Sequence, residues 1–145
     1  MIYSKPCMHG LRAVIYIATR NSESPVRGED IATEEELPQP FLSKILKVLA
    51  SRGILHSVRG PGGGFKLARL ASQIRLLDIV EAIDGLSMFE ECALGWKSCR
   101  DEQPCPLHNS WKPMRESLRS YLVETSVADL VTLETTVQGL GVRKK

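Results

Sequence analysis

The sequence predicts a mainly α-helical fold that contains one small β-hairpin and ends in a long helix. Apolar residues recur at three- and four-residue steps through most of the chain, which is the period of amphipathic helices. One segment, residues 54–68, has instead two short apolar runs around a glycine-rich turn, the pattern of a hairpin. The 145 residues suffice for one domain with its own core and an appended helical module.

Three helices are expected before the hairpin. The first covers about residues 5–19 with Ser4 as its cap, and the second covers about residues 28–35. The third covers about residues 39–51 and stops at Gly53. Their apolar stripes predict inward-facing residues, namely Leu11, Val14, Ile15 and Ala18 in the first helix, Ile31 and Ala32 in the second, and Phe41, Leu42, Ile45, Leu46, Val48 and Leu49 in the third.

The hairpin follows the third helix directly. Residues 54–58 and 65–68 are expected to be strands, and residues 60–64 the turn between them. A glycine-rich loop that cradles a nucleotide phosphate opens a helix, whereas this one joins two strands. Two short helices joined by a tight turn and followed by a hairpin predict a winged helix-turn-helix, which places its second helix in the major groove of DNA.

The second half of the chain is expected to hold a short helix at residues 74–84, a long helix ending near Thr125 and a short final helix that Ser126 caps and that ends near Glu134. Along the long helix, large residues recur at four- and three-residue steps: Leu107, Trp111, Met114, Leu118, Tyr121 and Thr125. This is the spacing of a seam between two packed helices. A stripe facing the chain's own core is the usual explanation, but a lone winged helix has too little surface to cover it. We therefore expect a homodimer that forms through Trp111, Met114, Leu118 and Tyr121.

These elements divide the chain into four parts. Residues 1–85 form the expected DNA-binding domain, and residues 86–106 form a loop that contains three cysteines. Residues 107–135 hold the dimerisation helix and the short C-terminal helix, and residues 136–145 are expected to be a disordered basic tail.

Charge is distributed unevenly along the chain. The net charge is only +2, but residues 1–75 carry 11 Lys and Arg against 6 Asp and Glu, and no acid lies between Leu37 and Leu77. An acid-free basic stretch of this length indicates a polyanion as partner. Because the chain is also expected to be a homodimeric winged helix-turn-helix protein, we expect this partner to be double-stranded DNA with a palindromic or pseudo-palindromic operator. The candidate DNA contacts lie on the free face of the third helix and on the wing: Gln39, Ser43, Lys44, Lys47, Arg59, Gly60 and Lys66.

Each candidate contact has a chemical reason. Gln39 and Ser43 can read base edges, and Lys44 and Lys47 can neutralise phosphates or meet guanine acceptors. Arg59 suits a narrow, A·T-rich minor groove, where negative potential concentrates. For lysines such as Lys47, a solvated surface is the competing explanation.

Cys92, Cys99, Cys105 and His108 are separated by six, five and two residues. Three thiols and an imidazole in one loop fit an iron–sulfur cluster, a zinc site, or a thiol or disulfide switch. Zinc sites usually contain tight Cys-x-x-Cys pairs, which this loop lacks. The chain has neither a signal-peptide pattern nor an apolar run long enough to span a membrane, so we expect a cytoplasmic protein with reduced cysteines.

Several motifs resemble the IscR/NsrR family of bacterial winged-helix regulators, which are dimers that hold an iron–sulfur cluster. The resemblance covers about residues 1–135 and is carried by the third helix from Pro40 to Leu46, the wing from Ser57 to Leu67, the segment from Asp78 to Gly85 and the three-cysteine loop. It implies a transcription regulator, not an enzyme, whose DNA affinity responds to iron or sulfur status, oxidants or nitric oxide.

The resemblance also implies the ligands. Cys92, Cys99 and Cys105 match the thiolate ligands of the family, and His108 matches the histidine ligand of its two-iron branch. The four-iron branch uses an acid from the partner's first helix, and Met8 stands at that position here, so a [2Fe–2S] cluster is favoured over [4Fe–4S]. The alternative fourth ligands are the neighbours of Met8, Cys7 or His9 of the partner chain.

Two other classes remain open from the sequence. A zinc-stabilised or thiol-switched DNA-binding regulator would need no cluster, and an iron–sulfur electron carrier would need no DNA. The basic hairpin argues against the electron carrier, because such a protein has no use for a polyanion-binding surface.

Overall fold

The computed structural model describes residues 2–20, 23–97 and 99–139, with only the backbone given for residues 134–139. Its elements in chain order are α1 (Lys5–Arg20), α2 (Gly28–Glu34), α3 (Gln39–Ser51), β1 (Leu55–Val58), β2 (Gly64–Leu67), the 3-10 turn η1 (Ala71–Gln73), α4 (Leu76–Ile83), the 3-10 turn η2 (Ser87–Phe89), α5 (His108–Glu124) and α6 (Val127–Gly139). The expected fold class is confirmed: the chain is mainly helical and carries a two-stranded antiparallel hairpin.

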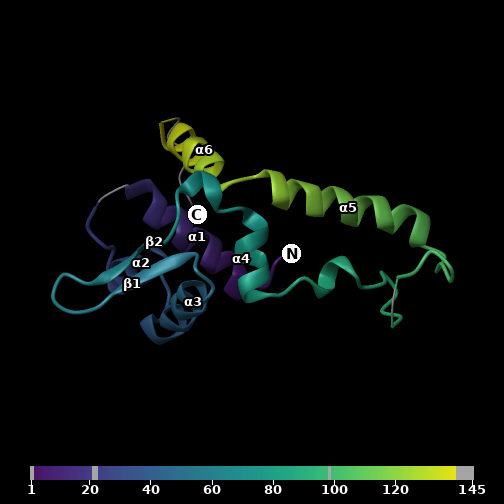
Figure 1. The fold of residues 1–145 in the computed structure, drawn as a ribbon, viewed down its shortest axis with the longest axis horizontal. Helices are drawn as coiled ribbons and strands as arrows, with labels where there is room; N and C mark the ends of the chain where they lie inside the picture. The colour runs from purple at the N-terminus through teal and green to yellow at the C-terminus, as the bar shows by residue number, and fades with distance from the viewer. Residues whose placement is uncertain (1, 21–22, 98, 140–145) are drawn as a thin grey trace.

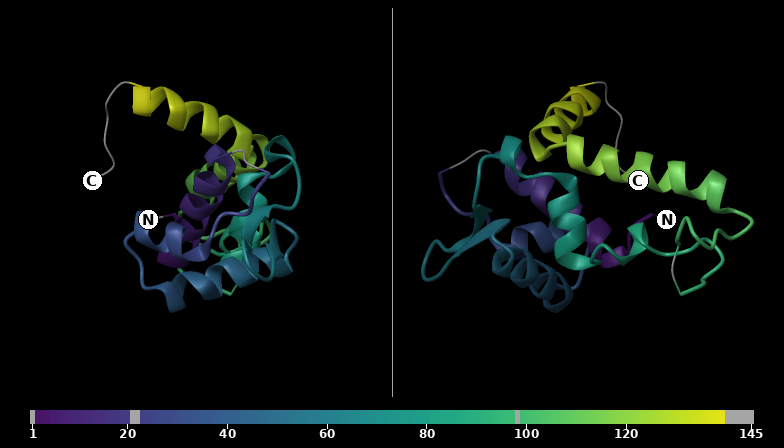
Figure 2. Two further views of the ribbon diagram at one scale, coloured as in Figure 1. Left: turned by 90° about the vertical axis from the view of Figure 1, so that its left-hand side faces the viewer. Right: turned by 45° about the vertical axis from the view of Figure 1, so that its right-hand side comes forward.

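The molecule is elongated (Figure 1). α1, α2 and α3 form a helical body from which the hairpin extends at one end, while α5 runs away toward the other end and carries the cysteine loop there. The right-hand view of Figure 2 shows the same separation of hairpin and loop, and α6 is folded back beside α1. The hairpin and the cysteine loop of one chain therefore lie at opposite ends of the molecule.

The helix-turn-helix depends on local signals in the sequence. Ser4 caps α1 as expected, since its Oγ accepts a hydrogen bond of 3.1 Å from the Cys7 N–H. Between α2 and α3, Glu36 takes a left-handed conformation with φ of 54°, and the Leu37 N–H donates to the Ala32 carbonyl at 2.9 Å. Proline at the second position of α3 suits a helix start, so the turn is short and well defined.

The inward face of α1 differs from the expected stripe. Its buried residues are Cys7, Gly10, Ala13, Val14 and Ile17. Val14 is buried as expected, but Leu11, Ile15 and Ala18 are only half-buried. The reason is close packing at Gly10, where an added Cβ would stand 2.4 Å from the Ile83 Cδ1 and 3.3 Å from the Ile45 Cγ2. α1 thus meets α3 and α4 through its smallest residue, a contact that a hydrophobicity pattern does not reveal.

The inward face of α3 is also narrower than expected. Leu42, Ile45, Leu46 and Leu49 are buried, as the stripe predicted. Phe41 and Val48, which were expected inside, are 38% and 39% exposed. Phe41 lies instead at the edge of the helix, where its ring meets the His9 ring edge-on with centroids 6.0 Å apart.

The hairpin is anchored to the body by a third segment. β1 and β2 pair in the register Leu55 with Leu67 and Val58 with Gly64. Beyond this pair, Phe65 exchanges two backbone hydrogen bonds of 2.8 Å with Val26, in the segment before α2. Gly64 permits this contact, because a Cβ there would lie 2.3 Å from the Val26 carbonyl oxygen.

Two hydrophobic clusters lie on either side of α1. The larger joins α1, α2, α3 and the hairpin, and the smaller contains Cys7, Leu76, Val80, Phe89 and Leu122 from α1, α4, η2 and α5. The end of α5 is tied to the body by backbone bonds, from the Leu76 N–H to the Thr125 carbonyl at 3.0 Å and from the Val127 N–H to the Ile74 carbonyl at 2.9 Å. The base of the long helix is therefore part of the folded body.

The C-terminal helix is longer than expected. Ser126 caps it, as expected, in a reciprocal arrangement with Asp129, whose carboxylate accepts from the Ser126 N–H at 2.8 Å. α6 continues to Gly139, beyond the expected end near Glu134, so residues 136–139 are helical where a tail was expected. The rest of that expected tail, residues 140–145, lies outside the described residues. Within the described parts of the chain, no helix has the length and apolar character needed to cross a membrane.

Candidate DNA-binding surface and cysteine loop

The candidate DNA contacts gather on α3 and the hairpin. All are exposed except Ser43, which is half-buried: Gln39, Ser43, Lys44, Lys47, Arg59, Gly60 and Lys66. None of the four basic residues among them forms an ion pair within the described part of the chain, so their charges are available to an outside anion. Gly60 opens the turn of the hairpin with φ of 94°, a conformation that favours glycine.

A shallow recess lies between the helix-turn-helix and the hairpin. Gln39 and Ser43 of α3 line it together with Gly63 of the hairpin turn and with Arg27 and Glu29 at the start of α2. Arg27 and Glu29 are both well exposed and form an ion pair of 3.1 Å. Arg27 was not among the expected contacts, because only the tertiary fold brings the segment before α2 beside α3.

Two of the loop cysteines face each other. Cys92 and Cys105 are both buried, at 6% exposure each, and their side chains are close enough for each to affect the pKa of the other. The Leu94 N–H points at the Cys92 sulfur and lowers the pKa of that thiol against the effect of burial, with smaller contributions from Cys105 and the Trp96 N–H. Burial raises the pKa of Cys105, and its contact with Cys92 raises it further.

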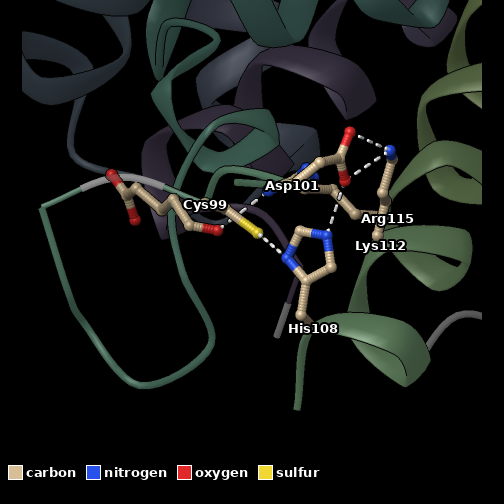
Figure 3. A network of polar contacts seen from close by, with 6 residues as sticks. Cys99, Asp101, His108, Lys112 and Arg115 are labelled. Carbon is tan, nitrogen blue, oxygen red and sulfur yellow. Dashed lines mark hydrogen bonds and ion pairs between the residues drawn. The ribbon is translucent and has the colours of Figure 1, made fainter. Parts of the chain in front are cut away.

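The third cysteine belongs to a second group. Cys99 Sγ lies 3.2 Å from Nδ1 of His108, and Nε2 of the same ring lies 2.8 Å from Asp101 Oδ1. Lys112 Nζ contacts both Asp101 oxygens at 2.9 Å (Figure 3). Lys112 thereby lowers the pKa of the Asp101 carboxyl, with a smaller effect from His108. His108 stands at the first position of α5 and is buried, so the helix holds it in the loop.

Asp101 and Lys112 were not among the expected site residues. A signal was available for Lys112, because it follows His108 by four residues and so shares its helix face. Arg115, also in this region, donates to the Glu91 carbonyl at 3.1 Å, and the Trp111 indole N–H donates to the same oxygen at 3.1 Å. Together these contacts fasten the start of the loop to α5.

The four expected ligands are thus brought together as two contacting pairs. The pairs are close enough that Cys99 contributes to raising the pKa of Cys105. In this arrangement, no three His, Cys, Asp or Glu side chains among residues 2–20, 23–97 and 99–133 form a ready-made metal site. All four cysteines of the chain are free thiols.

Cys7 and His9, the alternative ligands, sit elsewhere in the chain. Cys7 has no exposed area, and its burial and the nearby Asp84 raise its pKa to about 12. The pKa of His9 is lowered by burial and by the charges of Arg12 and Lys5. Its Nδ1 is buried and has no hydrogen-bond partner within the described residues.

The expected dimer seam splits into two stripes. Leu118 packs half-buried on the smaller hydrophobic cluster, and Trp111 is half-buried against the loop. Met114 and Tyr121 face outward, 65% and 50% exposed, and Leu107 is 44% exposed one heptad earlier. Leu122 is fully buried, although it was not part of the expected seam. The outward stripe therefore recurs every seven residues along one side of α5.

Comparison with known proteins agrees with this architecture. A putative HTH-type transcriptional regulator of Aquifex aeolicus is 33% identical over 92% of this chain and 94% of its own length. The solved structure of CymR, the global cysteine regulator of B. subtilis, superposes with a TM-score of 0.77 and 25% identity over 90% of this chain and 95% of that one. The structure of T. potens IscR superposes with a TM-score of 0.70 and 26% identity over 89% of this chain and 85% of that one.

The match to a protein family extends over both the helix-turn-helix and the cysteine loop. Residues 3–133 match the Rrf2 family, described as iron-dependent transcriptional regulators. With its winged helix, its exposed basic face and its cysteine-bearing loop, this chain belongs to the Rrf2 family of transcriptional regulators.

Proposed function

We propose that the protein is a cytoplasmic, homodimeric repressor or activator whose affinity for a palindromic operator is set by an iron–sulfur cluster in the cysteine loop. The observation that carries the proposal is the grouping of Cys92, Cys99, Cys105 and His108 in one partly buried loop. Membership of the Rrf2 family and the likeness to IscR support it.

The donor set fits such a cluster. Three reduced thiols and one imidazole are the ligand types of iron–sulfur centres in which histidine replaces a cysteine. Backbone N–H groups aimed at Cys92 favour its thiolate form, which is the form that binds metal. When bound, the cluster would join these side chains through bonds that are sensitive to iron supply, oxidants and nitric oxide. We favour the [2Fe–2S] form.

His108 is the best fourth ligand that the chain offers. It already contacts Cys99, and it lies in the same loop region as the other thiols. Cys7 is a poor candidate, because a fully buried thiol with a pKa of about 12 holds its proton at neutral pH. His9 lies on α1, where its ring packs edge-on against Phe41, and its Nδ1 is buried.

The loop can act on the DNA-binding face through packed elements. Phe89 and Leu122 lie in the smaller hydrophobic cluster with Cys7 of α1. α1 in turn contacts α3 at Gly10, next to Ile45, and its Arg12 binds Glu35 at the start of the α2–α3 turn. A change in loop geometry would shift α1 and with it the spacing of two recognition helices, which must meet grooves ~34 Å apart.

The test is a cysteine substitution in protein purified without oxygen. Cys99→Ala should lose the visible absorption of the cluster, together with bound iron and sulfide, and should change operator affinity. Cys7→Ala is the matched thiol control and should keep the chromophore, because Cys7 lies in the core. Operator binding by Cys99→Ala that equals binding by the iron-loaded wild type would contradict the sensor role.

A thiol switch is a second candidate, favoured by the contact between Cys92 and Cys105. CymR of B. subtilis, a structural neighbour, is a global cysteine regulator, and the structure of an oxidized form of the Staphylococcus aureus CymR has been solved. In this chain a mild oxidant would join the two sulfurs, releasing two protons and two electrons to the oxidant. Colourless protein without iron or zinc, in which oxidation forms this disulfide and shifts operator affinity, would favour the switch. One zinc per chain would instead indicate a structural zinc site.

A further inference from the structure

The imidazole of His108 is held from both sides. Nδ1 faces Cys99 Sγ at 3.2 Å, and Nε2 faces Asp101 Oδ1 at 2.8 Å, while the side chain is only 6% exposed (Figure 3). A carboxylate can only accept a hydrogen bond, and a neutral imidazole has one N–H and one lone pair. In the neutral ring, which is the form that binds metals, the N–H therefore belongs on Nε2, and the lone pair of Nδ1 faces the Cys99 sulfur.

Asp101 is itself held in place. Its side chain is 68% exposed, so an isolated Asp101 would sample several rotamers in solvent. Lys112 Nζ contacts both of its oxygens at 2.9 Å, which fixes the carboxylate plane and keeps one oxygen on the ring. Lys112 is one helical turn after His108 on α5, so the helix places the ammonium and the imidazole side by side.

We propose that Asp101, oriented by Lys112, is the positioning residue that presents Nδ1 of His108 to the metal. The inference rests on the proposed function in one respect only, that His108 is a ligand. Histidines that bind metals usually donate their second ring N–H to a carboxylate or carbonyl, which fixes the tautomer and the ring orientation. Asp101 supplies that acceptor here, from a position two residues after Cys99, so the same short segment provides a thiolate and orients the imidazole.

The first experiment uses the metal-free full chain and proton and nitrogen NMR of the imidazole. In the wild type, the Nε2–H of His108 should give a downfield resonance protected from exchange with water, because it is hydrogen-bonded and buried. Asp101→Ala should lose this signal, and Asp101→Asn should retain part of it through its amide oxygen. Glu102→Ala, a change at the neighbouring exposed acid, is the matched control and should leave it unchanged. A signal that persists in Asp101→Ala overturns the positioning role.

The second experiment follows the chromophore of iron-loaded protein during incubation with a chelator. Loss of a carboxylate behind a metal-binding histidine typically costs about 10- to 100-fold in metal affinity. Asp101→Ala should therefore lose its iron about 10-fold faster or more, and Lys112→Met should fall between this variant and the wild type. Glu102→Ala should match the wild type.

The two measurements separate this inference from the proposed function. If the wild type takes up no iron and sulfide, the cluster proposal fails, and the metal-free NMR result still decides whether Asp101 orients His108. If the wild type is loaded but Asp101→Ala loses iron no faster than Glu102→Ala, the positioning role is wrong and the cluster proposal stands.

Discussion

At the scale of single residues, the pair formed by Arg12 and Glu35 connects α1 to the helix-turn-helix. Arg12 Nε lies 2.5 Å from Glu35 Oε2, and the Glu35 side chain has no exposed area. Removing one partner of a buried ion pair leaves the other charge without compensation. Arg12→Met should therefore lower the free energy of unfolding by about 3 kcal/mol, as measured by urea denaturation followed by circular dichroism.

The exposed pair of Arg27 and Glu29 provides the control for this prediction. Both side chains are more than half exposed, so Arg27→Met should change stability by less than about 1 kcal/mol. The double variant Arg12→Met with Glu35→Gln should recover part of the loss, because no charge remains buried. Equal effects of Arg12→Met and Arg27→Met would show that the buried pair does not hold α1 against the turn.

At the scale of elements, the hairpin holds Arg59 in a fixed position relative to the helical body. The double hydrogen bond between Phe65 and Val26 fixes β2 to the body, and Arg59 follows β1 directly at the exposed turn. Arg59→Ala should weaken operator binding without changing stability, and should reduce the slope of log affinity against log salt by about 1 if it contacts a phosphate or a charged groove. Fluorescence anisotropy at several salt concentrations measures both quantities.

An arginine on another element serves as the comparison. Arg119 is exposed on α5, away from the hairpin, and Arg119→Ala should leave affinity and salt slope unchanged. If Arg59→Ala loses more affinity for operators with A·T-rich flanks than for other operators, Arg59 contacts a narrow minor groove. An unchanged salt slope in Arg59→Ala would mean that the Arg59 charge does not contact DNA.

At the scale of the whole molecule, the outward stripe of α5 is the surface expected to form the dimer. Met114 and Tyr121 stand exposed one heptad apart on a helix that extends from the body. A glutamate at either position would place an unpaired charge in the seam, so Met114→Glu and Tyr121→Glu should each raise the dimer dissociation constant about 30-fold or more. Sedimentation equilibrium measures this constant directly.

Ser120→Glu adds the same charge to an exposed position on a different side of α5 and should leave the dimer intact. If Met114→Glu and Tyr121→Glu both sediment as the wild type does, the outward stripe is not the interface. Monomeric variants should also lose most of their operator affinity, because two half-sites must then be bound independently.

The local structure follows closely from the sequence. α3 begins and ends where expected, at Gln39 and Ser51, and the caps at Ser4 and Ser126 form as expected. These features depend on residues within a few positions of one another, so their energies can be judged from the sequence alone. The grouping of three cysteines and His108 was visible for the same reason, because one loop and the helix start after it contain them all.

Only the tertiary structure decided which surfaces meet. It buried Gly10 where α1 meets α3 and α4, left Phe41 exposed, and brought Arg27 beside the recognition helix. Within the loop it paired Cys92 with Cys105 and aligned Cys99 with His108 and Asp101. Such contacts depend on the shape of the partner surface and on long-range chain geometry. Hydrophobic period and residue spacing record neither of these.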